Sequence, residues 1–116
     1  MTDWDRAATV DVVKDGGGVV IKCEGAMDLH NSKEFHDVLI EASREADSLV
    51  VDFLAVSYID TAILADLAVA ANKMIARGKR LQVKVAEPTH PLRTLQVTGF
   101  SAVLDVLVSP KEEPAA

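Results

Sequence analysis

Residues 49–64 read LVVDFLAVSYIDTAIL, and this stretch decides the fold. An apolar run over residues 48–53 predicts a buried strand, and a helical pattern begins directly after Asp60 and Thr61. We read the stretch as a strand, a tight loop and a helix that opens with a hydroxyl side chain. Unpaired backbone N–H groups and the positive end of the helix dipole meet at such a position, so a phosphate on Thr61 would be well tolerated. This arrangement suits a switch better than an active site.

The composition indicates one small acidic domain. The chain has 116 residues, 49% of them apolar, which is enough to build a single core. A formal net charge of −6 argues against nucleic acid or an anionic membrane as a partner. The apolar runs are shorter than the roughly 20 residues that span a bilayer, and Asp3 and Asp5 stand where a secretion signal carries cations. Cys23 is the only cysteine, so we expect a cytoplasmic protein without an internal disulfide.

Alternation and turn signals predict the other elements. Strands are expected near residues 9–14, 19–24, 80–86 and 103–108. Helices are expected after a cap at Asn31 or Ser32, over residues 61–76, and between Thr89 and Gly99. In the second helix, Ile63, Leu64 and Leu67 belong to the stripe that faces inward. Residues 1–8 are expected to form a lead-in and residues 109–116 a disordered tail.

Polar side chains on three predicted strands separate competing folds. The second, third and fourth strands each carry one polar face, marked by Lys22, Asp52 and Lys84. In a doubly wound sheet, helices cover both faces and the central strands are apolar throughout. We therefore expect an α/β fold in which a mixed four- to five-stranded sheet has its helices packed on one face. The three polar side chains should then be exposed together on the other face, which argues against a receiver-type or flavodoxin-like fold.

Taken in order, these motifs resemble a STAS domain over residues 9–108, and more narrowly a bacterial anti-sigma factor antagonist. The resemblance is carried by residues 25–28 (GAMD), by the strand and loop of residues 49–61, and by residues 97–100 (VTGF). In that family a Gly-x-x-Asp segment follows the second strand, and here Gly25 and Asp28 match it. The family's central strand ends in Asp-Ser-Ser-Gly-Leu, where a partner kinase phosphorylates the Ser directly after Asp. Residues 60–64 (DTAIL) occupy these positions.

The match departs from the family pattern at three positions. Thr61 replaces the phosphorylated Ser, which keeps the hydroxyl but adds a β-branch that stiffens χ1. Ala62 removes the second hydroxyl of the motif. Ile63 replaces Gly and adds bulk where a partner's backbone would otherwise come close.

The resemblance implies a protein-binding switch that is not an enzyme and needs no cofactor, metal or small-molecule substrate. While unphosphorylated, a surface formed by Asp28, Asp60, Thr61 and Ile63 would dock an anti-sigma factor with kinase activity. The kinase would use ATP to phosphorylate Thr61, and the added charge beside Asp60 would break the complex. The alternative is a STAS subunit without phosphotransfer, acting as a scaffold in a signalling assembly or as a regulator of a transporter ATPase.

The residues themselves leave simpler interpretations open. Thr61 or Asp60 could be an ordinary helix N-cap, and Asp28 could be either a turn residue or a partner contact. His30 and His36 are six residues apart, do not share a helix face, and have no nearby Cys to complete a zinc site. The sequence contains neither a Gly-x-Ser-x-Gly elbow nor a glycine-rich phosphate loop that ends in Lys-Ser/Thr. These absences argue against an enzyme.

Overall fold

A computed structural model describes residues 8–28 and 32–110. In chain order its elements are β1 (Thr9–Asp15), β2 (Gly18–Met27), α1 (Ser32–Glu45), β3 (Ser48–Ile59), α2 (Thr61–Ala76), β4 (Leu81–Glu87), α3 (His90–Thr98), η2 (Phe100–Ala102) and β5 (Asp105–Pro110). The candidate cap Asn31 and most of the expected lead-in and tail lie outside the described residues. Ser109 and Pro110, which were expected in the tail, belong to β5.

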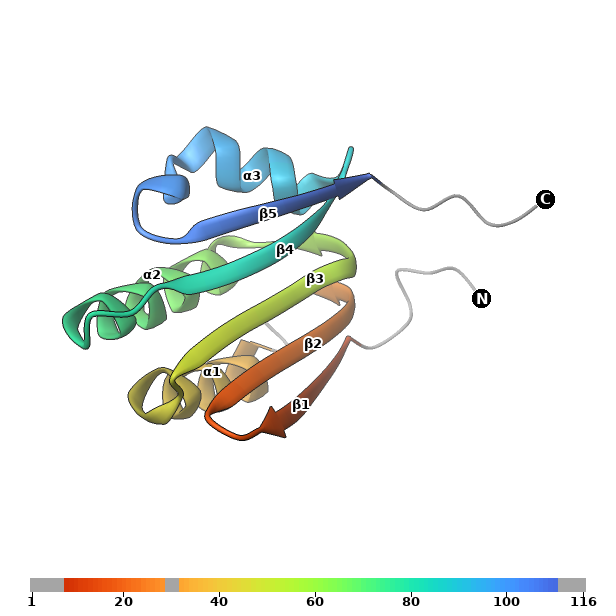
Figure 1. The fold of residues 1–116 in the computed structure, drawn as a ribbon. Coiled ribbons are helices and arrows are strands. Elements are labelled where there is room, and N and C mark those ends of the chain that lie inside the picture. Colours follow the sequence, from red (N-terminus) through yellow and green to blue (C-terminus); the bar gives the residue numbers. More distant parts are fainter. Residues whose placement is uncertain (1–7, 29–31, 111–116) are drawn as a thin grey trace.

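The five strands form one mixed sheet in the order β1-β2-β3-β4-β5. β1 and β2 pair antiparallel through a tight hairpin, in which Gly16 adopts a positive φ of 62°. The other neighbouring pairs are parallel. α1 connects β2 to β3, α2 connects β3 to β4, and α3 with the short η2 connects β4 to β5. Figure 1 shows α1, α2 and α3 behind the sheet, with the strands toward the viewer.

Buried side chains from all three helices and from one face of the sheet form a single core. Its fully buried members include Ile21, Phe35, Leu39, Val51, Ile63, Leu67, Leu81, Val83 and Leu95. On the opposite face, Lys22, Asp52 and Lys84 are register partners and form one row across β2, β3 and β4. Lys22 is exposed, whereas Asp52 and Lys84 are half-buried. The predicted one-sided fold is confirmed, although two of the three polar side chains are less exposed than expected.

The helix α2 covers Thr61–Ala76 as predicted, but the tight loop expected before it is wrong. β3 continues through the expected loop to Ile59, and β2 likewise extends to Met27. Register shifts between Lys22 and Glu24, and again after Gly25, interrupt the regular pairing of these strands. Such bulges break the two-residue period from which strands are recognised, which explains why the extensions were not predicted.

The one-sided core predicts different consequences for two leucines on neighbouring strands. Leu81 in β4 is fully buried, so Leu81→Ala is expected to lower the free energy of unfolding by about 2–5 kcal/mol. Leu107 in β5 is the register partner of Lys84 and is 40% exposed. Leu107→Ala should therefore cost less than about 1 kcal/mol. Urea denaturation measures both values, and equal losses would contradict a core on one face alone.

Candidate functional site

The parallel strands β2 and β3 end side by side at one edge of the sheet. Met27 and Ile59 are their last register pair, and the Asp60 N–H donates to the Met27 carbonyl at 3.2 Å. Asp28 and Asp60 directly follow these strand ends, and Thr61 opens α2 at the same edge. The structure therefore brings three of the four candidate site residues to one place.

Asp60 is the N-cap of α2. Its backbone is extended, with φ −104° and ψ −177°. Its carboxylate oxygen Oδ1 accepts hydrogen bonds from the N–H groups of Ala62 at 3.0 Å and Ile63 at 3.3 Å. The Asp60 carbonyl also accepts the first hydrogen bond of the helix, from Leu64 at 3.2 Å. Of the two candidate caps, the structure therefore selects Asp60.

Thr61 is the first residue of α2 and is exposed. Its hydroxyl makes no hydrogen bond to any other described residue. Since Asp60 already occupies the amides of Ala62 and Ile63, no capping role is left for this hydroxyl. Thr61 presents a hydroxyl group to solvent beside a carboxylate, at the positive end of a helix dipole.

Ile63 does not lie on this surface, and the expectation of a surface contact through its side chain is wrong. The side chain is fully buried in the core. Ile63 and Leu67 lie one helical turn apart and face the sheet together, as their spacing predicted. The bulk added by Ile in place of Gly therefore fills the core and is not presented to a partner.

Tyr58 and His90 also lie beside the site, although the sequence did not single them out for it. Their rings stack with centroids 4.6 Å apart and an interplanar angle of 26°. The Ile59 N–H donates to Nδ1 of His90 at 3.3 Å. No local pattern could have revealed this contact, because it forms only where α3 begins next to the end of β3.

The described residues offer little for catalysis or metal binding. Cys23 is fully buried, and burial raises the pKa of its thiol to about 12, helped by the carboxylates of Asp52, Asp11 and Glu34. Such a thiol is not a ready nucleophile. Within residues 8–28 and 32–110, no group of three or more His, Cys, Asp or Glu side chains is arranged to hold a metal ion. No helix of the described part is both long and apolar enough to cross a membrane.

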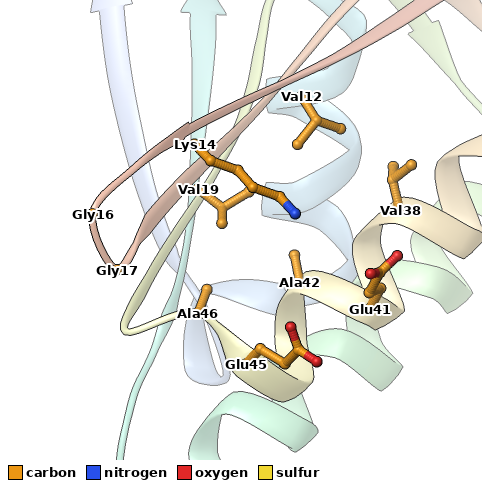
Figure 2. A pocket seen from close by; sticks show the side chains of 10 residues that line it. All are labelled: Val12, Lys14, Gly16, Gly17, Val19, Val38, Glu41, Ala42, Glu45 and Ala46. Atoms are coloured by element: carbon orange, nitrogen blue, oxygen red, sulfur yellow. The ribbon is translucent and has the colours of Figure 1, made fainter.

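A hollow of about 330 Å³ lies between the β1–β2 hairpin and α1 (Figure 2). Apolar side chains such as Val12, Val38 and Ala42 line it, and Lys14 and Glu41 contribute charged groups. No histidine, hydroxyl or thiol side chain is among its lining residues. The hairpin is at the end of the sheet opposite to Thr61, so this hollow is separate from the candidate site.

Comparison with known proteins identifies the family. The family model described as the Mlab, STAS domain matches residues 10–108. The chain therefore belongs to the STAS domain family. No curated protein sequence matches it significantly.

Solved structures share the fold at low sequence identity. An anti-sigma factor antagonist from Mycobacterium paratuberculosis has a TM-score of 0.75 at 20% identity, with 87% of this chain and 86% of that chain covered. The anti-sigma factor antagonist SpoIIAA in its unphosphorylated form has a TM-score of 0.74 at 15% identity, with coverage of 89% and 90%. The phosphorylated form of the Bacillus cell fate determinant SpoIIAA has a TM-score of 0.67 at 15% identity, with coverage of 89% and 93%. At these identities the likeness concerns the fold.

The capping geometry predicts that substitutions at the adjacent residues Asp60 and Thr61 change stability by different amounts. Asp60→Ala removes the acceptor for two helix amides and should lower the free energy of unfolding by about 1 kcal/mol. Asp60→Asn keeps a capping oxygen and should recover most of that loss. Thr61→Ala removes a hydroxyl that caps nothing and should change stability by less than about 0.5 kcal/mol. Thermal and urea unfolding measure all three, and a larger loss for Thr61→Ala than for Asp60→Ala would contradict the assigned cap.

Proposed function

We propose that this STAS domain is an anti-sigma factor antagonist whose docking is controlled by phosphorylation of Thr61. The observation that carries the proposal is the exposed Thr61 hydroxyl at the start of α2, released from capping by Asp60. The shared fold with anti-sigma factor antagonists supports the same role. In this role the protein works in the cytoplasm, where it frees a sigma factor by occupying the anti-sigma factor.

The docking surface is formed by Asp28, Asp60 and Thr61 at the edge where β2 and β3 end. Asp28 and Asp60 are half-buried and Thr61 is exposed, so the surface combines two partly covered carboxylates with an accessible hydroxyl. A partner that fits it would present cationic side chains or backbone N–H groups. Opposite charges across an interface steer encounter and fix the relative orientation of the two proteins.

Phosphorylation changes this surface in a way that the helix start does not compensate. The phosphate adds a charge of about −1.5 to −2. The first amides of α2 already donate to Asp60, and the first turn of α2, residues 61–64, contains no cation. Like-charge repulsion from Asp60, together with the cost of desolvating the phosphate in an interface, would then separate the proteins.

Catalysis belongs to the partner kinase in this mechanism. The Oγ1 atom of Thr61 forms a bond to the γ-phosphorus of ATP, and the bond between that phosphorus and the ADP oxygen breaks. The hydroxyl proton passes to a base of the kinase. The STAS domain contributes the acceptor and its position.

Incubation with ATP, magnesium and the anti-sigma kinase of the same organism should add one phosphate, located at Thr61 by mass spectrometry. Thr61→Ala should abolish the modification and still bind the kinase, whereas Thr61→Ser should retain it. Thr98→Ala is a matched control, because Thr98 is also exposed but lies at the end of α3. That variant should be phosphorylated like the wild type.

Thr61→Glu should fold, because an acidic group suits the start of a helix, and should bind the kinase at least about tenfold more weakly than the wild type. Affinity is measured beside thermal stability, so that misfolding is not mistaken for lost binding. Equal affinities of Thr61→Glu and the wild type would refute the phosphorylation switch. That result would favour the alternative in which the same surface docks a signalling assembly or a transporter ATPase constitutively.

The isolated protein should neither hydrolyse ATP nor phosphorylate itself. The candidate site contains two carboxylates and a hydroxyl, and the described residues contain no metal-binding cluster near them. A coupled ADP-release assay and an autoradiograph test this expectation. Reproducible turnover that a point substitution within this chain abolishes would show that the domain is an enzyme.

A further inference from the structure

His90 connects α3 to the strand end that precedes the Thr61 site. Its Nδ1 atom accepts the Ile59 N–H at 3.3 Å, and its ring stacks on Tyr58. A ring nitrogen that accepts a hydrogen bond carries no proton, so the form of the ring that makes this contact holds its proton on Nε2. Ile59 is followed directly by Asp60 and Thr61, which form the proposed docking surface.

The hydrogen bond between Ile59 and His90 stands where β3 has no hydrogen bond to β4. The pairing of β3 with β4 ends at Asp52 and Lys84, although β3 continues to Ile59. β4 instead continues alongside β5 as far as Glu87, and Figure 1 shows it curving away from β3. A hollow of about 420 Å³, lined by residues 54–57 and 88–90, opens between them. The end of β3 is therefore held by the β2 ladder on one side and, at the Ile59 amide, by His90.

We infer that His90 is a positioning residue for the Thr61 site, and that protonation of its imidazole loosens that site. The functional part of this inference rests on the proposed docking role. An imidazolium carries N–H groups on both nitrogens, so its Nδ1 can no longer accept the Ile59 amide. Two donors would then face each other, and an amide without its acceptor is unfavourable. The strand end would detach from α3, and docking would weaken as the ring gains its proton.

Few charged groups face the imidazole. Glu87 at the end of β4 and Arg93 in α3 line the hollows next to it, and Tyr58 of β3 covers one ring face. Glu87 and Arg93 have opposite charges, so their effects on an imidazolium oppose each other. No ion pair involves His90 within the described part of the chain. The Thr94 hydroxyl lies 3.5 Å from Nδ1 and 3.4 Å from Nε2 of His90, and a hydroxyl can donate or accept with either form of the ring. The hydrogen bond from Ile59 is the contact that requires an unprotonated Nδ1.

Three variants separate positioning from general structural support. His90→Asn keeps an oxygen that can accept the Ile59 N–H, but it does not titrate near neutral pH. His90→Phe keeps an aromatic ring to stack on Tyr58 but has no acceptor. His36→Asn is the control, since His36 lies on α1 and contacts Asp66 of α2 instead of β3.

Amide hydrogen exchange of the free protein tests the positioning directly. When the pH is lowered from about 7.5 to about 5.5, protection of the Ile59 amide should fall about tenfold in the wild type and in His36→Asn, after correction for intrinsic exchange. In His90→Asn it should stay within about twofold, and in His90→Phe it should be low at both pH values. Unchanged protection in the wild type, or an equal fall in His90→Asn, would overturn the inference.

Affinity for the anti-sigma kinase then tests the functional consequence. When the pH is lowered over the same range, the dissociation constant of the wild type should rise about tenfold relative to that of His90→Asn. Taking this ratio removes any effect of pH on the kinase itself, because that effect is common to both variants. A constant ratio would overturn the claimed effect on docking. A third result is possible, in which protection of the Ile59 amide depends on pH but the protein binds no kinase at either pH. That result would support the positioning role and count against the proposed function.

Discussion

The site depends on one interaction, the acceptance of the Ala62 and Ile63 amides by the carboxylate of Asp60. A helix start leaves amides unpaired, and some group must satisfy them. Because Asp60 does so from the residue before the helix, Thr61 is left with an exposed hydroxyl that has no structural duty. The helix start is therefore capped without any contribution from the Thr61 hydroxyl.

The fold determines what stands beside that hydroxyl. Parallel pairing of β2 and β3 brings Asp28 and Asp60 to one edge of the sheet, because both strands end at the Met27–Ile59 pair. Helices cover one face of the sheet, and the inward stripe of α2, including Ile63, is buried there. Thr61 at the start of α2 remains exposed. The core thus fixes the position of the proposed switch without occupying its surface.

At the same edge of the sheet, β4 diverges from β3, so the end of β3 has no neighbouring strand on that side. A strand end that loses its neighbour needs another partner for its backbone amides. Here the imidazole of His90 accepts the Ile59 amide and packs on Tyr58. A histidine side chain thereby stands in for a sheet hydrogen bond directly before the proposed docking surface.

Sequence patterns predicted the parts of this structure that follow regular periods. The helical spacing of Ile63 and Leu67 marked the inward face of α2, and the polar positions Lys22 and Lys84 revealed an open sheet face. The extension of β3 was not predicted, because after Phe53 the buried side chains recur every third residue instead of every second. Because residues 54–59 lack the alternation that marks a strand, they were expected to form a loop.

Contacts between segments that are distant in the sequence could not be predicted from local sequence patterns. The two candidate caps at residues 60 and 61 could be distinguished only once the backbone of Asp60 was seen to be extended. Ile63 was expected both in the inward stripe and on the docking surface, and helix geometry allows only the first. The stack of Tyr58 on His90 joins residues from two elements that meet through the curvature of the sheet.

The most direct test of the central claim compares two forms of one preparation. The protein is phosphorylated to completion by its anti-sigma kinase, half of it is returned to the free threonine with a phosphatase, and both halves are titrated with fresh kinase without nucleotide by calorimetry. The account predicts that the phosphorylated half binds about 100-fold more weakly, equivalent to about 2.7 kcal/mol, and that phosphatase restores the affinity. Equal affinities of the two halves, with the phosphate confirmed on Thr61, would contradict it.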